Sequence, residues 1–241
     1  MFGSKDKNSL NLGDYLGTDI HSHVIPGIDD GAAKLVDSIA LIHGFIDLGY
    51  KKIVTTPHIY AEVFPNTPAT INSAFEILLE EVKKLNLPLN LKFAAEYFLD
   101  FEFLSLTELG NLLSFGSRYV LIETSFYSPY QNLLDVIFDL AVRGYKPILA
   151  HPERYMYSKP KNWFQNLKEK GCLFQVNILS FEGYYGKLPQ KTAYELLDLN
   201  LIDFLGSDLH HEKGLNILKD FRPDKKLISV LESDRLLNKA L

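Results

Sequence analysis

The chain has 241 residues, of which 46% are apolar and 23% are charged, and its formal net charge is −5 at pH 7. These values are ordinary for a globular protein with one large α/β domain or two small ones. The acidic balance argues against a nucleic-acid-binding protein, which usually carries an excess of Lys and Arg. The single Cys172 excludes an internal disulfide and is consistent with a reducing compartment.

The N-terminal segment predicts a loose leader at residues 1–17, followed by one domain at residues 18–241. The leader has no apolar core of the kind found in signal peptides. No apolar run approaches the roughly 20 residues needed to span a bilayer. We therefore expect a cytoplasmic protein without direct membrane insertion, and the sequence leaves its oligomeric state open.

A repeating unit organises the chain, in which a helical pattern is followed by a glycine and then by a β-branched apolar run. Gly49, Gly144 and Gly171 stand where a helix C-terminus favours a left-handed residue. Strands that alternate with helices in this way predict a parallel sheet. The predicted strands lie near residues 18–23, 52–57, 92–97, 119–124, 146–150, 172–177 and 203–207.

The segments between these strands show apolar residues at helical spacing. One such stripe consists of Ile71, Ala74, Leu78, Val82 and Leu85. The number of strand–helix units and the length of the chain are near those of a TIM-like barrel. A doubly wound open sheet would give the same local pattern, so the pattern alone leaves both architectures open.

Residues of the types that bind metals stand at or near the C-terminal ends of most predicted strands. His21 and His23 share one face of the first strand, because side chains alternate along a strand. The other candidates are Asp29, Asp30, His58, Glu96, Glu123, His151, Asp208 and His210. Because parallel α/β proteins build their sites at this end of the strands, we expect these side chains to converge.

Imidazole and carboxylate donors together suit Zn, Mn or Fe, and their number exceeds the needs of one ion. Glu96 or Asp208 would then bridge neighbouring ions. Such a cluster activates water and binds the oxygens of a phosphoryl group during in-line displacement. Arg154 is the best candidate to bind a phosphate with its planar donors, and a rim salt bridge is the alternative. His43, within a helix, predicts a surface or packed residue.

Several motifs resemble those of the PHP (polymerase and histidinol phosphatase) superfamily. They are "TDIHSHVIPGIDDGA", "IVTTPH", "AAEY", "LIET", "LAHPER" and "GSDLH", between about residues 18 and 212. Within the superfamily they are most similar to the bacterial CpsB/YwqE-type metal-dependent tyrosine phosphatases of capsule and exopolysaccharide loci. The resemblance implies a single-domain distorted TIM-like (β/α)7 barrel with parallel strands. It also implies three divalent metal ions, usually manganese or iron and sometimes zinc.

The resemblance further implies a role for each candidate ligand. The first ion would take His21, His23, Glu96 and Asp208. Glu96 would bridge to a second ion held by Glu123 and His151. The third would take Asp30, His58 and His210, with Asp29 as the alternative to Asp30. Arg154 matches an arginine that binds substrate phosphate, whereas a further arginine common in the family is replaced by Lys213, with His211 as another neighbour.

The implied reaction is hydrolysis of phosphotyrosine on the C-terminal tail of a bacterial tyrosine kinase. Arg154 and the metal ions would offset charge on the phosphoryl oxygens, and His58 or His210 are candidates to assist. Loop aromatics would frame the phenyl ring or simply pack the mouth of the barrel. They are Phe64, Phe126, Tyr127, Tyr130, Tyr184 and Tyr185.

Other interpretations compete with this one. A small-molecule phosphatase of the histidinol-phosphatase type would use the same scaffold. A catalytically silent metal-binding partner protein is disfavoured by the intact ligand set. An amidohydrolase usually has a bridging lysine, which has no counterpart where Glu96 and Glu123 stand. A cysteine phosphatase is excluded, since "LFQVNI" after Cys172 contains neither an arginine nor a glycine-rich loop.

Overall fold

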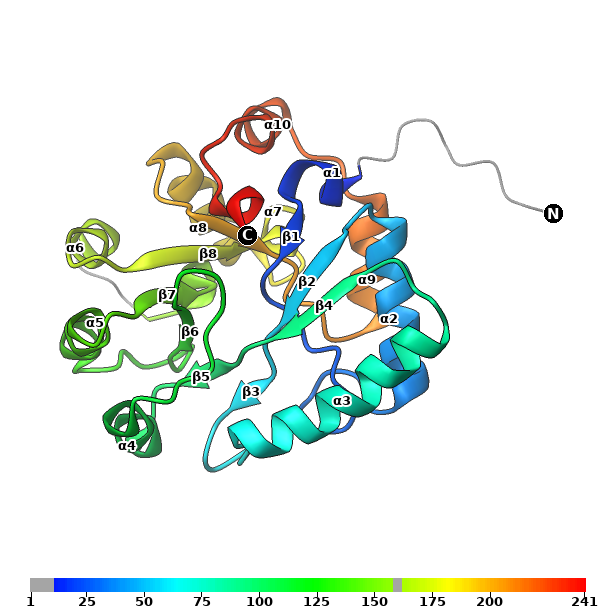
Figure 1. The fold of residues 1–241 in the computed structure, drawn as a ribbon. Coiled ribbons are helices and arrows are strands. Elements are labelled where there is room, and N and C mark those ends of the chain that lie inside the picture. Colours follow the sequence, from blue (N-terminus) through cyan, green and yellow to red (C-terminus); the bar gives the residue numbers. More distant parts are fainter. Residues whose placement is uncertain (1–10, 158–161) are drawn as a thin grey trace.

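The computed structural model describes residues 11–157 and 162–241, which form an α/β fold with parallel strands and helices around them (Figure 1). The predicted α/β class with parallel strands is therefore confirmed. The strands are β1 (Thr18–Asp19), β2 (Lys52–Thr55), β3 (His58–Ile59), β4 (Asn90–Phe93), β5 (Glu96–Phe98), β6 (Tyr119–Glu123), β7 (Lys146–Ala150), β8 (Leu173–Asn177) and β9 (Phe204–Gly206).

The helices occupy the segments between strands and the two ends of the described chain. They are α1 (Leu12–Leu16), α2 (Leu35–Asp47), α3 (Pro68–Lys84), α4 (Phe101–Leu109), α5 (Leu133–Val142), α6 (Trp163–Glu169), α7 (Ile178–Phe181), α8 (Lys187–Asp198), α9 (Glu212–Asp220) and α10 (Lys225–Glu232). Short 3-10 turns, η1 (Pro152–Arg154) and η2 (Leu237–Ala240), follow β7 and α10. No helix in the described ranges is both long and apolar enough to cross a membrane.

The strands of the described residues form two sheets and no single closed sheet. The three-stranded sheet has the order β1-β2-β4, and the six-stranded sheet has the order β3-β5-β6-β7-β8-β9. Beyond the ends of β1 and β9, Ser22 and Leu209 form an isolated parallel bridge. The amide of Asp208 also donates to the carbonyl of His21 at 2.8 Å. The first and last metal-binding motifs are thereby placed side by side.

Three of the predicted strands differ from the observed ones. The strand expected at 18–23 ends at Asp19, so His21 and His23 lie beyond it. The strands expected at 52–57 and 92–97 are each interrupted, and their second halves, β3 and β5, join the larger sheet. Pro57 stands at the first interruption and has no amide hydrogen to donate to a neighbour. The other four strands match their predicted positions closely.

Residues 12–17, predicted to belong to the leader, are instead part of the fold. Leu12 and Leu16 of α1 are buried in the main hydrophobic core. A Cβ atom at Gly13 would lie 2.1 Å from the backbone carbon of Gly49, so only glycine lets α1 approach this closely. The remainder of the predicted leader, residues 1–10, lies outside the described residues.

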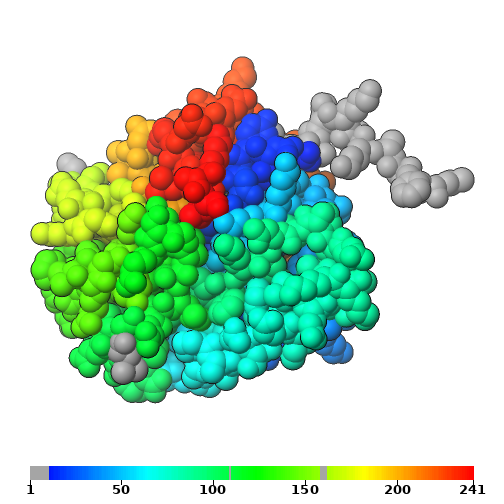
Figure 2. Space-filling view, in the orientation of Figure 1, coloured from blue at the N-terminus to red at the C-terminus, as the bar shows by residue number. Residues whose placement is uncertain are grey.

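A second, smaller core fills the space among the strands. Its buried members are Ile20, Val54, Ala94, Phe115, Leu121, Ile148, Ala150 and Phe204. Leu237 and Leu241 pack against this cluster from the C-terminal segment. Figure 2 shows this segment, in red, between the blue N-terminal residues and the green middle of the chain. The N-terminal side of the strands is thus filled with apolar residues, and the polar candidates gather at the other end.

Candidate metal centre

The structure brings all nine predicted metal ligands into four overlapping groups. Within each group, one donor atom per residue lies within 4.8 Å of the others. The groups are His21/His23/Asp208, His21/Glu96/His151, His58/Glu96/Glu123 and His23/Asp30/His58/His210. The groups overlap, because His21, His23, His58 and Glu96 each belong to two of them.

Glu96 lies at the centre of these groups. Its Oε2 atom is 3.1 Å from Nε2 of His21 and 3.1 Å from Nδ1 of His58, and its Oε1 atom is 3.1 Å from Nε2 of His151. The side chain is fully buried on β5, facing the middle of the site. A carboxylate so placed can bridge two ions through its two oxygens, which is one of the two bridging positions the sequence left open.

Buried donor atoms without hydrogen-bond partners test whether a metal fits here. In the described residues, Nε2 of His21, Nε2 of His23 and Oε2 of Glu96 are buried and make no hydrogen bond, although the two nitrogens lie 3.1 and 3.5 Å from the carboxylate oxygen. Leaving such atoms unsatisfied is costly, and all three face the same space. Imidazole nitrogen and carboxylate oxygen are the donors that Zn, Mn and Fe accept. The site therefore fits divalent transition metals.

The electrostatics of the centre also favour cations. Burial would lower the pKa of His21, but the carboxylates of Glu96 and Asp208 raise it to about 10. Burial and the neighbouring Glu96 carboxylate raise the pKa of Glu123 to about 8. These shifts record a concentration of negative charge that a proton or a metal ion can relieve. Metal binding at His21 would displace a proton from its ring.

Exposure divides eight of the nine candidates into two parts, and Glu123, which is 7% exposed, lies between them. We call His21, His23, Glu96, His151 and Asp208 the inner part, since none is more than 4% exposed. We call Asp30, His58 and His210 the outer part, since their side chains are 57%, 13% and 20% exposed. Oδ1 of Asp30 lies 3.3 Å from Nε2 of His210 and 3.5 Å from Nε2 of His58.

Asp29 and Asp30, the two alternatives for one ligand position, make different contacts in the structure. Asp29 accepts hydrogen bonds from Nδ1 of His23 at 2.8 Å and from the amide of His58 at 3.1 Å. Asp29 therefore orients the ring of His23 and the backbone of His58 through hydrogen bonds. Asp30 faces the rings of His58 and His210 directly and shares a group of possible metal donors with them.

Arg154 lies at the edge of the centre, on the turn η1 after His151. Its guanidinium is held between two aromatic rings, 4.5 Å from the centroid of Phe126 and 4.2 Å from that of Tyr185. Its Nη1 atom donates to Oδ2 of Asp208 at 2.8 Å. These contacts fix the plane of the guanidinium beside the ligands.

Two of the ligands have unusual backbone conformations. His151 has a φ of 33° and Asp208 a φ of 50°, both in the left-handed region. Non-glycine residues reach this region at an energetic cost, and such residues concentrate at functional sites. His151 directly follows β7, and Asp208 stands two residues after the end of β9.

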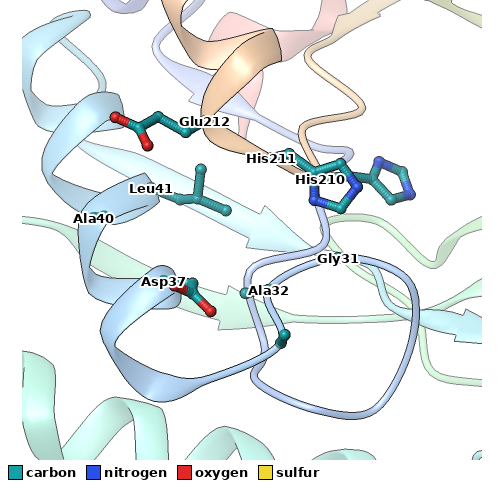
Figure 3. A pocket seen from close by; sticks show the side chains of 9 residues that line it. Gly31, Ala32, Asp37, Ala40, Leu41, His210, His211 and Glu212 are labelled. Atoms are coloured by element: carbon teal, nitrogen blue, oxygen red, sulfur yellow. The ribbon is translucent and has the colours of Figure 1, made fainter.

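Two cavities flank His210 and His211. One, of about 200 Å³, is lined by Arg154, Tyr184, Tyr185 and Asp30 among others. The other, of about 290 Å³, is lined by small residues such as Gly31, Ala32 and Ala40, with the carboxylates of Asp37 and Glu212 at its edge (Figure 3). His210 of the outer part therefore borders both cavities.

The remaining candidates fall at various distances from the centre. Phe64 stacks on His58 with ring centroids 5.3 Å apart, whereas Tyr127 is 82% exposed. Tyr130 is half-buried against the main core. Lys213 is exposed, with its Nζ atom 5.5 Å from the ring centroid of Tyr184. His43 is exposed on α2, as predicted.

Cys172 does not belong to the site. It is fully buried in the main core, and burial raises the pKa of its thiol to about 12. A thiol in this state is a poor nucleophile at neutral pH, in agreement with its prediction as a packed residue.

Sequence reasoning missed two residues that contact the ligands. Gln175 lies 2.7 Å from Nδ1 of His21, and Nδ2 of Asn177 lies 2.6 Å from Oδ2 of Asp208. Both stand on β8, the predicted strand to which we assigned no ligand. The signal was present, because two amides two residues apart share one face of an otherwise apolar strand.

Comparison with known proteins identifies similar chains of known activity. The sequence is 32% identical over 200 residues to the tyrosine-protein phosphatase YwqE of Bacillus subtilis, covering 82% of this chain and 79% of the relative. It is 28% identical over 200 residues to the tyrosine-protein phosphatase CpsB of Streptococcus pneumoniae, covering 80% and 82%. A putative tyrosine-protein phosphatase CapC of Staphylococcus aureus is 30% identical over 225 residues, covering 89% and 85%.

A solved structure and a family profile agree with these matches. The structure comes from work on YwqE of Bacillus subtilis and CpsB of Streptococcus pneumoniae, described as metal-dependent tyrosine phosphatases. Its TM-score is 0.78 at 31% identity, and the likeness covers 90% of this chain and 87% of that one. The family profile described as "Capsular polysaccharide synthesis, CpsB/CapC" matches residues 17–216. The chain therefore belongs to the CpsB/CapC family of capsular polysaccharide synthesis proteins.

Proposed function

We propose that the chain is a metal-dependent protein-tyrosine phosphatase, a phosphoric monoester hydrolase that acts in capsule or exopolysaccharide control. The observation that carries this proposal is the convergence of nine metal-type ligands with Arg154 at their edge. The family and its tyrosine phosphatase members support the same activity. The substrate we propose is phosphotyrosine on the C-terminal tail of a bacterial tyrosine kinase, and a cytoplasmic location stays a prediction.

The centre would hold three divalent ions, with Mn or Fe preferred and Zn also suitable. The four donor groups support more than one ion, because each contains at least three residues and they overlap through His21, His23, His58 and Glu96. The assignment of ligands to ions remains the one implied by the resemblance. We also propose that the two sheets together make a distorted (β/α)7 barrel. The bridge between Ser22 and Leu209 supports this, because it links the end of β9 to the end of β1.

The bound ions would supply positive charge that activates water and offsets charge on phosphoryl oxygens. The chain's own residues bind and orient the substrate. Arg154, held between two rings, would donate to the phosphate oxygens when its bond to Asp208 is exchanged for them. Lys213 would add a point charge nearby. His58 and His210 are placed on the open side, where they can assist departure of the phenolate.

The aromatic residues of the rim would frame the phenyl ring of the substrate. Tyr184 and Tyr185 line the cavity of about 200 Å³ beside Arg154. Phe64 stacks on His58, and Phe126 lies against the guanidinium of Arg154. A flat ring attached to a phosphate at the metal centre would therefore meet apolar surfaces close to the reacting atoms.

Elemental analysis combined with peptide hydrolysis tests this function. The purified protein should contain divalent metal, hydrolyse a phosphotyrosine peptide, lose that activity on chelation and regain it with Mn²⁺. Histidinol phosphate is the comparison substrate, because preferential turnover of it would favour a small-molecule phosphatase instead. Activity that survives complete chelation would contradict the metal-dependent mechanism, and a metal-loaded protein without any aryl phosphatase activity would favour a silent partner protein.

A further inference from the structure

Strand β8 supplies two buried amides to the metal centre but no ligand. Gln175 and Asn177 are both fully buried and share one face of the strand. Their side chains form a continuous chain of hydrogen bonds between two ligands of the inner part. Nε2 of Gln175 donates to Oδ1 of Asn177 at 2.8 Å, and Nδ2 of Asn177 donates to Oδ2 of Asp208 at 2.6 Å. Oε1 of Gln175 lies 2.7 Å from Nδ1 of His21.

The carboxylate at one end of this chain determines the direction of every bond in it. Ionised Asp208 can only accept, so Asn177 must present its NH₂ group to Asp208 and its oxygen to Gln175. Gln175 must then present its NH₂ group to Asn177 and its oxygen to His21. An oxygen facing Nδ1 of His21 requires a hydrogen on that nitrogen. Nε2, which faces Glu96, is left as the nitrogen that can bind a metal.

Gly206 on β9 makes room for this arrangement. A Cβ atom added there would lie 2.7 Å from Nε2 of Gln175 and 2.9 Å from Cβ of His21. Both distances are shorter than carbon and nitrogen atoms tolerate, so a side chain at this position would push Gln175 away from His21. The glycine of the "GSDLH" motif therefore leaves space for the amide of Gln175 on the neighbouring strand.

We propose that Gln175 and Asn177 form a polarised amide relay that fixes the His21 ring with its hydrogen on Nδ1 while it holds Asp208 by Oδ2. The two amides are positioning residues for the first metal ion. His23 achieves the same orientation through the carboxylate of Asp29. Two neighbouring histidine ligands are thus oriented by different chemistry, one by a neutral amide and one by a charged group. The proposal rests on the proposed metal centre but not on the identity of the substrate.

The tautomer of His21 can be observed directly in the unaltered protein. Long-range ¹H–¹⁵N correlation spectra of the Zn²⁺-loaded chain report which ring nitrogen carries hydrogen. We expect the His21 ring to carry a slowly exchanging hydrogen on Nδ1 and to bind Zn²⁺ through Nε2. A hydrogen on Nε2, or Zn²⁺ bound through Nδ1, would overturn the proposal. This measurement needs no variant and does not depend on phosphatase activity.

Zn²⁺ affinity, measured by competition with a chromophoric chelator, tests the relay as a unit. Gln175→Leu and Asn177→Leu should each weaken the tightest site by about 10- to 100-fold, the usual loss when a residue that orients a ligand is removed. The double variant should lose no more Zn²⁺ affinity than the weaker-binding single variant, because either change interrupts the same series of hydrogen bonds. Losses that multiply in the double variant would show two independent structural roles and overturn the relay.

Two further variants separate the relay from general damage to the fold. Gln190→Leu removes a glutamine on α8 that donates to the carbonyl of Phe181 at 2.7 Å, away from the ligands, and should leave Zn²⁺ affinity unchanged. Gly206→Ala keeps both amides but displaces Gln175, and should weaken Zn²⁺ binding as Gln175→Leu does. Equal losses in Gln190→Leu and Gln175→Leu, or full affinity in Gly206→Ala, would contradict the proposal. Thermal unfolding of each metal-free variant identifies any that fail to fold.

Discussion

The inner and outer parts of the metal centre differ in how their ligands are held. Three of the five inner candidates have a hydrogen-bond partner outside the ligand set: His21 has Gln175, His23 has Asp29, and Asp208 has three donors on its Oδ2 atom. Glu96 instead faces the rings of other candidates, and Nδ1 of His151 has no hydrogen-bond partner among the described residues. The outer Asp30 is more than half exposed. The centre thus combines a rigid inner half with an accessible outer half.

This difference leads us to expect tight metal binding in the inner part and substrate access in the outer part. Ligands oriented by buried hydrogen bonds lose little entropy when an ion binds, so the inner ions should bind tightly and exchange slowly. His210 lines both cavities and Asp30 lines one of them, so we expect the substrate to enter from this side. An outer ion would exchange more readily with solvent. Substitutions on the two sides should therefore have effects of different size and kind.

The largest effect is expected from Glu96→Gln in the inner part. The amide keeps the size of the side chain but removes the charge that lies between the rings of His21, His58 and His151. Bound metal should fall by more than one ion per chain, and turnover should fall by more than about 100-fold, beyond the loss of a residue that merely orients a ligand. Elemental analysis and peptide hydrolysis measure both. Full metal content in this variant would contradict the central position of Glu96.

Arg154→Lys tests the proposed phosphate contact of Arg154 at the edge of the centre. Lysine keeps the charge but loses the planar donors and the stacking between Phe126 and Tyr185. Loss of about 2 kcal/mol of charged hydrogen bonding would lower kcat/KM by roughly 30-fold, with metal content unchanged. Arg118→Lys is the matched control, since Arg118 also stacks on a ring, that of Tyr145, but stands before β6, at the opposite end of the strands. An equal loss in both variants would argue against a phosphate contact.

Asp30→Asn tests the outer part alone. The variant should weaken binding of one ion by at least about 10-fold while the inner ions stay bound, because the ion pairs of Asp30 in the described residues are with the outer rings of His58 and His210. Excess Mn²⁺ should restore most of the activity. Asp135→Asn, on the exposed face of α5, provides the control for loss of one carboxylate. Loss of all the ions in Asp30→Asn would show that the two parts do not bind metal independently.

The smallest effect is expected from Lys213→Ala at the rim. An exposed charge near Tyr184 contributes little in water, so kcat/KM should fall by less than about fivefold. The loss should shrink further at high salt, which screens a point charge. A steady-state comparison at low and high ionic strength measures this. A loss comparable to that in Arg154→Lys would instead assign Lys213 a direct part in binding the phosphate.

The convergence of the candidate ligands could be predicted from the sequence, because parallel strands direct their C-terminal residues to one place. Histidines and acids after successive apolar runs were therefore sufficient to predict a shared site. The orienting residues were harder to recognise, since Gln175 and Asn177 are neutral and stand inside a strand that otherwise reads as apolar. Their role depends on what β1 and β9 bring next to them, which a single strand cannot reveal.

The differences in the fold have similar causes. The strands expected at 52–57 and 92–97 are interrupted because neighbouring segments bend from one sheet into the other, a tertiary effect that apolar periodicity does not encode. Helix α1 has only five residues, too few for a helical repeat to be recognised. Its position depends on Gly13 lying against the backbone of Gly49, which is a contact between distant segments.

The left-handed backbone at His151 and Asp208 lowers conformational stability at two positions whose side chains belong to the candidate site. Selection for a stable chain alone would place glycine at these two turns, where a side chain costs on the order of 1 to 3 kcal/mol each. Glycine, however, brings neither an imidazole nor a carboxylate. The protein thus retains two locally unfavourable residues for the sake of its chemistry, and a version evolved only for heat resistance would be expected to lose its ions first at these positions.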